Sequence, residues 1–173
     1  MKRRVAALAV VPLLLAACGP GDGGRVAAPG TPGVTSAPCP APVNQGNGCI
    51  YLGTLTDLTG PFRLVAGRAT EAQRAFWARV NRQGGIGGYD IDVSANVVDT
   101  GYDVDRFVRA YGETKDKVLA YAQLTGSPQA AAVLPDMARQ TIVGAPLGWT
   151  SRWAFEDNII ESGGNYCFEA MNA

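Results

Sequence analysis

Short apolar runs alternate with helix-type patterns between residues 50 and 168, and this alternation limits the folds open to the chain. The first run, from residue 50 to 55, is mostly apolar and typical of a buried strand. A helix is predicted from residue 67 to 83, and the glycines that follow predict its end, because glycine tolerates left-handed backbone. The residues expected on the apolar face of this helix are Ala69, Ala72, Phe76 and Val80.

The same alternation continues through the rest of the chain. Further strands are predicted at residues 89–98, 118–124 and 141–145, and a last one is expected to begin within 159–168. Further helices are predicted from residue 104, with Asp103 as the N-cap, over 127–139, and briefly near 152–158. This order predicts an α/β fold in three layers, αβα, with a mostly parallel sheet covered on both faces by helices.

Parallel sheets of this kind bind ligands beyond the carboxyl ends of their strands. Three loops follow predicted strands, at residues 56–66, 123–129 and 146–151. We expect them to lie on one common rim and to form a ligand site there.

The N-terminal residues have the composition of an export signal. Lys2, Arg3 and Arg4 are followed by an apolar run too short for a membrane-spanning helix, which needs roughly 20 residues. The junction Leu15-Ala16-Ala17-Cys18 resembles the lipobox of bacterial lipoproteins, which implies cleavage before Cys18 and lipid attachment to it. The alternative is an ordinary secretory signal with a chance cysteine.

Three segments are therefore expected. Residues 1–17 are a lipoprotein signal peptide, and residues 18–48 are a Gly/Pro-rich disordered tether, because they lack the apolar periodicity that a packed core needs. Residues 49–173 form the folded part.

The composition argues against several classes of function. The chain has no histidine, which excludes imidazole bases, His-based triads and His-ligated zinc. Its net charge is +0 and no basic stripe is present, which argues against nucleic acid as a partner. Without a G-x-S-x-G motif or a cluster of metal ligands, the sequence predicts neither an enzyme nor a cofactor or metal site.

The cysteines after Cys18 leave two disulfide pairings open. An exported chain enters an oxidising compartment, where Cys39, Cys49 and Cys167 can be oxidised. Cys39 can pair with Cys49 across a loop rich in Pro, Asn and Gly, or Cys49 can pair with Cys167. Sequence alone does not fix the pairing, and one or more of these thiols can also remain free.

Five stretches in order resemble one family. They are IYLGTLTDLTGP at residues 50–61, ARVNRQGGIGG at 78–88, and the segments 97–100, 125–128 and 142–146. Together they resemble the type I periplasmic binding proteins, and within them the branched-chain amino acid (leucine-binding-protein-like) group of ABC-transporter substrate-binding proteins. The resemblance covers about residues 49 to 168.

The resemblance implies a two-lobed clamp that closes on a small ligand and presents it to an ABC permease. This chain reaches Ala173 about where the first crossing into a second lobe is expected, so it is predicted to hold the N-terminal lobe. With the lipid on Cys18, the protein is expected at the outer face of the cell membrane, in amino acid transport. The alternatives are a ligand-sensing lipoprotein that contacts a signalling protein, and a non-functional truncated fragment.

The resemblance also implies which residues hold the ligand. Hydroxyls and backbone amides at Thr125, Gly126 and Ser127 are expected to bind a carboxylate, since a loop entering a helix offers free donors. The second ligand loop corresponds to Leu147, Gly148, Trp149 and Thr150, where Trp149 falls near the position of a family threonine. The ligand is therefore expected to be an amino acid or a similar small polar molecule. Two alternatives stay open: Ser127 as a simple helix cap, and Trp149 as a lobe-surface residue.

Overall fold

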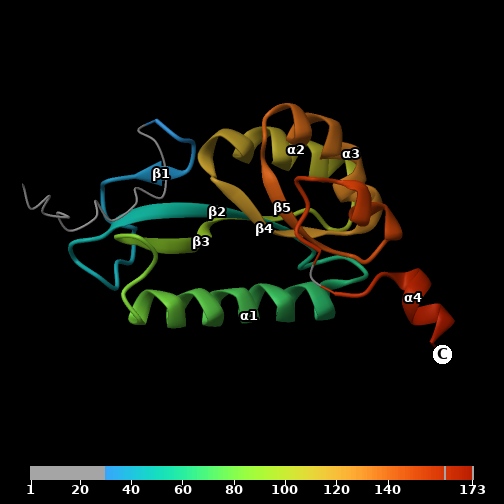
Figure 1. Ribbon diagram of the computed structural model, residues 1–173, viewed down its shortest axis with the longest axis horizontal. Coiled ribbons are helices and arrows are strands. Elements are labelled where there is room, and N and C mark those ends of the chain that lie inside the picture. The colour runs from blue at the N-terminus through green and yellow to red at the C-terminus, as the bar shows by residue number, and fades with distance from the viewer. Residues whose placement is uncertain (1–29, 162, 173) are drawn as a thin grey trace, which may run out of the picture.

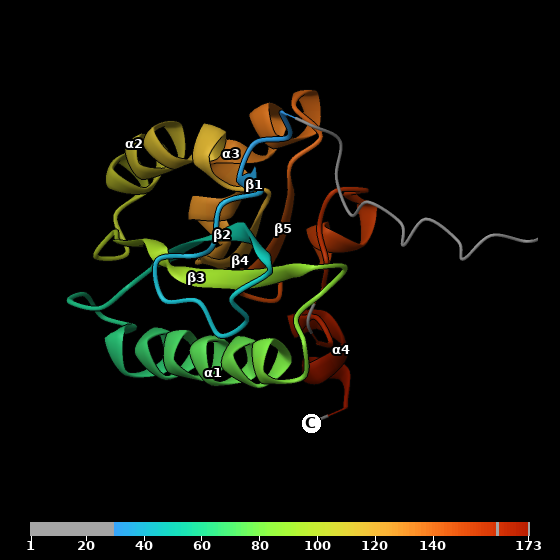
Figure 2. The ribbon, with the colours of Figure 1, turned by 90° about the vertical axis from the view of Figure 1, so that its left-hand side faces the viewer.

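A mostly parallel sheet lies between two helical layers in the computed structural model, which describes residues 30–161 and 163–172 (Figure 1). Its strands are β1 (Val34–Thr35), β2 (Gly48–Thr56), β3 (Tyr89–Asp99), β4 (Ala120–Thr125) and β5 (Val143–Leu147). Helix α1 (Arg63–Arg82) covers one face, and α2 (Val104–Thr114) and α3 (Ser127–Arg139) cover the other (Figure 2). The predicted three-layer α/β fold is confirmed. The export signal, Cys18 and the tether up to residue 29 lie outside the described residues.

Strand β2 is the centre of the sheet. β3 pairs in parallel along one of its edges, and β4 pairs in parallel on the other, with β5 beyond β4. The short β1 pairs antiparallel with β2 at Cys49 and Ile50, whereas β4 begins its pairing at Leu52. β1 and β4 therefore share one edge of β2, end to end.

The last part of the described chain differs from the predicted strand within residues 159–168. Only Ile159 bridges in parallel to Gly144, and the helix α4 (Tyr166–Met171) follows. The side chain of Asn165 caps α4 by accepting from the amides of Cys167 (3.1 Å) and Phe168 (3.2 Å). The described residues also include two short 3-10 helices, η1 (Lys115–Lys117) and η2 (Ser151–Phe155).

The larger hydrophobic core lies between the sheet and the layer of α2 and α3. Its members include Leu55, Phe107, Tyr121, Leu124 and Trp153, all buried. Asp103 caps α2 as predicted, because its carboxylate accepts from the Arg106 amide at 2.7 Å. A smaller cluster under α1 contains Ile50, Leu52, Ile91 and Val93.

The predicted apolar face of α1 is wrong in part: Ala69 and Val80 are half-buried, but the two residues predicted between them are not. Ala72 and Phe76 are exposed, and the buried residues of the helix are Ala66, Thr70 and Asn81. This buried face is largely polar because its side chains bond to the sheet, as Asn81 does with the backbone of Ile91 in both directions at 2.9 Å. Apolar periodicity does not detect a face of this kind.

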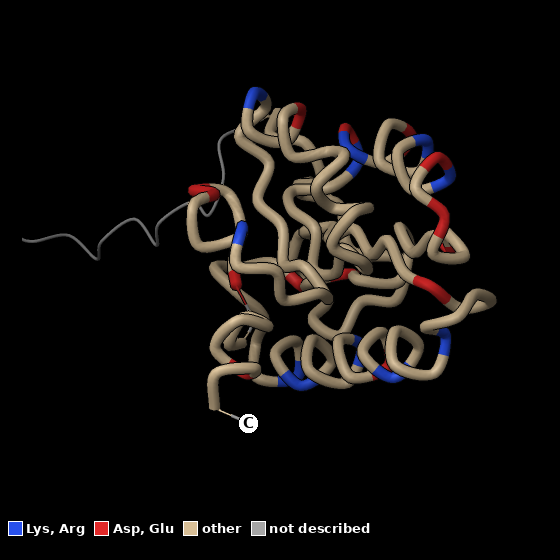
Figure 3. The backbone as a smooth tube through the Cα atoms, turned by 90° about the vertical axis from the view of Figure 1, so that its right-hand side faces the viewer, with Lys and Arg blue, Asp and Glu red and all other residues tan. Residues whose placement is uncertain are grey.

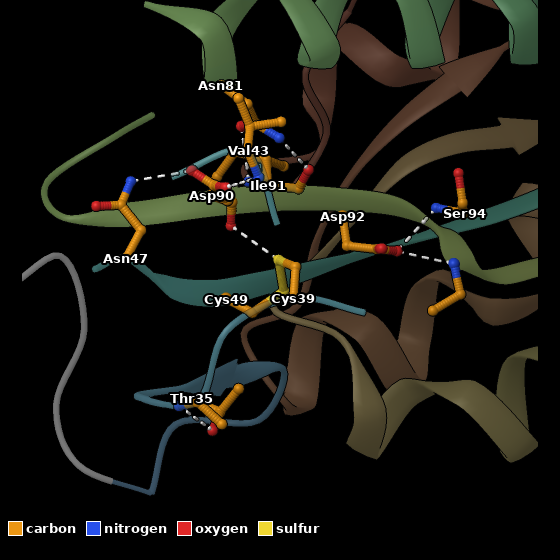
Figure 4. The surroundings of a disulfide bond; sticks show 12 residues. Thr35, Cys39, Val43, Asn47, Cys49, Asn81, Asp90, Ile91, Asp92 and Ser94 are labelled. Carbon is orange, nitrogen blue, oxygen red and sulfur yellow. Dashed lines mark hydrogen bonds between the residues drawn. A yellow bond between two sulfur atoms is a disulfide. The ribbon is translucent and has the colours of Figure 1, made fainter. Parts of the chain in front are cut away.

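Residues 30–48 pack against the domain, which differs from the disordered tether expected there. Cys39 and Cys49 form a disulfide, so this pairing is the one adopted, while Cys167 is free and exposed. Buried Asp90 of β3 holds the loop between the two cysteines (Figure 4). Its carboxylate accepts from the amides of Val43 (2.8 Å) and Asn44 (2.9 Å) and from the side chains of Asn44 (2.7 Å) and Asn47 (2.9 Å).

Candidate ligand-binding site

A cavity of about 230 Å³ opens at the carboxyl ends of the parallel strands. Its wall is built from the loops after β2, β3, β4 and β5, from the last residues of β4 and β5, and from the first turns of α1 and α3, while α4 supplies one residue. The lining residues are Phe62, Val65, Ala66, Tyr102, Thr125, Gly126, Ser127, Leu147, Gly148, Trp149 and Tyr166. The loops predicted to share a rim therefore do so.

Gly126 joins β4 to α3 and shapes the floor of this cavity. It is the N-cap of α3 with φ 100°, and its amide donates to the carbonyl of Leu147 at 3.0 Å. A Cβ at this position would collide with Oε1 of Gln129 and lie 2.9 Å from Cε2 of Tyr102. Only glycine combines this backbone conformation with this packing.

Ser127 and Thr125 bring hydrogen-bonding groups to the cavity. Ser127 is the first residue of α3, and Gly126 rather than Ser127 is the cap, without a side-chain cap hydrogen bond. The first amides of a helix have no intrahelical acceptor and carry partial positive charge, so they favour an anionic ligand group. Thr125 is buried and its hydroxyl accepts from Nε2 of Gln123 at 3.0 Å.

The second predicted ligand loop is divided by the structure. Leu147, Gly148 and Trp149 line the cavity, whereas Thr150 does not line it. The hydroxyl of Thr150 instead accepts from the Arg152 amide at 3.4 Å, as the N-cap of η2. The carbonyl of Gly148 accepts from the indole Nε1 of buried Trp153 at 2.6 Å, which fixes this loop from below.

Three aromatic residues that line the cavity, Phe62, Tyr102 and Tyr166, were not predicted as ligand residues. Phe62 and Tyr102 stack with ring centroids 4.4 Å apart, and Tyr166 meets Trp149 edge to face at 6.1 Å. Phe62 lies in a loop already expected on the rim, and Tyr102 follows β3, so the strand-end rule could have found both. No local sequence pattern indicates Tyr166, because it comes from α4 and its backbone amide donates a hydrogen bond to the Trp149 carbonyl (2.7 Å).

Two aspartates at strand ends hold the loop that carries Phe62. Asp57 accepts from the amides of Gly60 (2.5 Å) and Phe62 (2.8 Å), and Asp99 accepts from Leu58 (2.9 Å). Burial raises the pKa of Asp99, but hydrogen bonds from surrounding amides and a hydroxyl outweigh it and lower that pKa overall. Both carboxylates are committed to loop geometry, as expected for Asp at turns.

The cavity lining contains no ionisable side chain other than the tyrosines Tyr102 and Tyr166. Burial, together with Tyr166 and Asp57, raises the pKa of Tyr102, so its phenol stays protonated at neutral pH. The charged residues lie mainly on the outer helices, with both signs interspersed (Figure 3). Across residues 30–161 and 163–172, no group of three or more acidic or cysteine side chains is arranged to hold a metal ion. Within the same residues, no helix has the length and hydropathy of a membrane span.

The chain belongs to the periplasmic binding protein family, whose profile matches residues 49–168. This is a family of solute-binding proteins rather than enzymes, in agreement with the sequence analysis. The match over residues 49–168 confirms the resemblance to periplasmic binding proteins that the sequence analysis described.

Solved structures show the same fold. The fatty acid ABC transporter substrate-binding protein from Thermomonospora curvata is 31% identical, with a TM-score of 0.68 over 81% of this chain and 34% of its own. A possible leucine/isoleucine/valine-binding protein from Rhodopirellula baltica is 19% identical (TM-score 0.66, 72% of this chain, 34% of its own). A branched-chain amino acid ABC transporter protein from Thermus thermophilus is 14% identical (TM-score 0.62, 72% and 35%).

The chain thus spans about a third of the length of these structures. No curated protein sequence matches it.

Proposed function

We propose that the chain is the first lobe of an extracytoplasmic solute-binding lipoprotein of an ABC importer. It binds an amino acid or a similar small polar molecule at the strand-end cavity, between this lobe and a second one, and delivers it to a permease. The observation that supports this most is that Ser127, Trp149 and Phe62, which follow three different strands, meet around one cavity.

The chemistry of the cavity suits a carboxylate on an apolar body. Thr125 and Ser127 of the cavity lining carry hydroxyls, and the Ser127 amide at the start of α3 has no intrahelical acceptor. Aromatic and aliphatic side chains form the remaining wall, which favours an aliphatic or aromatic body. Similar structures fit this chemistry: the Thermus thermophilus protein has bound valine, and a Rhodopseudomonas palustris solute-binding protein is in complex with 4-hydroxybenzoate.

Trp149→Ala is expected to weaken ligand binding about fivefold to tenfold, because an aromatic contact contributes about 1–1.5 kcal/mol. The full chain, ¹⁵N-labelled, is titrated to millimolar concentrations with L-leucine, octanoate and 4-hydroxybenzoate while the Gly126 and Ser127 amide resonances are followed. Phe155→Ala is the control, since Phe155 is 86% exposed and does not line the cavity. If no compound moves these two resonances in the unmodified protein, the proposed site is wrong.

The lipid anchor is tested separately, at Cys18. In a bacterial host, the unmodified chain is expected to incorporate labelled palmitate and to sediment with membranes, because two or more acyl chains give stable anchoring. Cys18→Ser removes the acceptor thiol and is expected to abolish both signals, while Cys167→Ser leaves them intact. Equal labelling of the Cys18→Ser variant would contradict the anchor.

A further inference from the structure

Four polar side chains form a buried cluster directly beneath the ligand cavity. Thr56 ends β2, Thr70 lies on α1, and Gln123 and Thr125 lie on β4. Their exposed fractions are 0%, 3%, 2% and 2% in that order. Only Thr125 also lines the cavity, so it connects the cluster to the ligand site.

The surroundings of Gln123 fix the orientation of its amide. Nε2 lies 3.0 Å from the hydroxyl of Thr56 and 3.0 Å from that of Thr125, and 3.4 Å from the carbonyl of Ala66. A carbonyl oxygen can only accept, so it must face the amide nitrogen. Oε1 then faces Thr70, whose hydroxyl lies 3.3 Å away.

This orientation assigns the hydroxyl protons of the cluster. The two Nε2 protons of Gln123 go to Thr56 and Thr125, so both hydroxyl oxygens accept. Thr56 gives its own proton to Thr70 across 3.0 Å, and Thr70 gives its proton to the Ala66 carbonyl at 2.9 Å or to Gln123. Among the described residues, the Thr125 proton has no acceptor, and the cavity is the space that Thr125 lines.

We propose that Gln123 is a positioning residue that makes the Thr125 hydroxyl a hydrogen-bond donor toward the cavity. The site therefore selects a ligand group that presents an acceptor oxygen, a carboxylate or a carbonyl, and discriminates against a group that can only donate, such as an ammonium. Gln123 itself does not touch the ligand. This inference rests on the proposed function, because it assigns selectivity to the same cavity.

The chain offers a matched control in Gln73. Its Nε2 donates to the carbonyl of Ala122 at 2.8 Å, so it also links α1 to β4 through an amide. It makes no hydrogen bond to Thr125 and does not line the cavity. A purely structural contribution of a glutamine between α1 and β4 is therefore measured by Gln73→Met.

The test compares benzoate, which only accepts, with benzylamine, which is cationic and only donates. In the full chain, benzoate is expected to shift the Gly126 and Ser127 amides and benzylamine is not. Gln123→Met is expected to raise the dissociation constant for benzoate about fivefold, the usual effect of one lost hydrogen bond. Thr125→Val is expected to do the same, and Thr125→Ser to restore most of the affinity. Gln73→Met is expected to leave the affinity unchanged.

The double variant separates positioning from general damage. In the Thr125→Val background, Gln123→Met is expected to change benzoate affinity by less than twofold, because its effect acts through the Thr125 hydroxyl. Two results would overturn the proposal and leave the proposed function standing. One is that Gln123→Met lowers benzoate affinity equally in the unmodified chain and in Thr125→Val. The other is that Gln73→Met lowers benzoate affinity as much as Gln123→Met does.

A second measurement needs no ligand and is decisive even if Gln123→Met unfolds the chain. The two side-chain amide protons of Gln123 are expected to have distinct, slowly exchanging resonances, and Thr125→Val should shift one of them far more than the other. If neither shifts, Gln123 does not orient Thr125 and the inference is wrong. If the shift occurs but benzoate and the other compounds fail to bind, the proposed function is what fails, and the selectivity with it.

Discussion

Trp153→Ala is expected to lower the free energy of unfolding by about 3–5 kcal/mol, the usual range for removing a buried tryptophan. Trp153 is only 2% exposed and packs into the larger core from η2. Its indole also donates to the Gly148 carbonyl at 2.6 Å, so the substitution removes both apolar volume and a support of the ligand loop. Urea unfolding monitored by circular dichroism measures the loss.

Two further variants divide the contribution of Trp153. Phe155→Ala, from the same short helix, is expected to cost less than about 0.5 kcal/mol because Phe155 is 86% exposed. Trp153→Phe keeps much of the side-chain volume but loses the indole donor. Its loss in free energy of unfolding should therefore lie between those of Trp153→Ala and Phe155→Ala. A loss for Trp153→Ala as small as that for Phe155→Ala would show that η2 does not anchor the core.

Asp90→Asn is expected to cost about 2–4 kcal/mol at pH 7, because hydrogen bonds to a buried carboxylate are strong and their donors would lose an acceptor. Asp90 accepts from Val43, Asn44 and Asn47, which lie in the loop closed by the disulfide (Figure 4). Asp92→Asn is the matched control. Asp92 lies on the same strand, but it accepts only from the local amides of Ser94 and Ala95.

The loss of stability in Asp90→Asn should depend on pH, because it depends on the ionisation of the Asp90 carboxylate. Burial raises the pKa of Asp90, but the hydrogen bonds from Asn44, Val43 and Asn47 outweigh it, so the pKa lies below its ordinary value of 3.8. The stabilisation is therefore complete above pH 3.8 and is lost as the pH falls through the lowered value of the folded state. The difference in free energy of unfolding between the unmodified protein and Asp90→Asn should become smaller toward pH 2. A difference that stays constant with pH would show that Asp90 is not ionised in the folded protein.

The arrangement of strands and the position of the rim could be predicted from sequence because they depend on local pattern. Each buried strand has its own apolar run, and parallel pairing brings the loops that follow to one edge. The loops that hold Ser127 and Trp149 were predicted in this way, and both residues line the cavity. The face of α1 was predicted only in part, because Thr70 and Asn81 are buried through polar bonds to other elements, which apolar periodicity does not reveal.

Other features depend on contacts between distant residues. Residues 30–48 have the composition of a flexible segment, yet Asp90 and the Cys39–Cys49 bond hold part of them in place. Thr150 was predicted as a ligand residue, but it follows Trp149 by one position and caps η2 instead. Tyr166 reaches the cavity only through the path of the chain after β5. The orientation of Thr125 depends on Gln123, which a single sequence does not show.

The shared edge of β2 has a mechanical consequence. Tension applied at residue 30 would load β1 first and peel its two residue pairs away from β2. The load would then reach the Cys39–Cys49 disulfide, a covalent bond that does not break when hydrogen bonds rupture. Beyond the disulfide, β2 is paired on both edges with the parallel strands β3 and β4. A pulling force applied at the N-terminal side should therefore stop unfolding the chain before it distorts the mouth of the cavity.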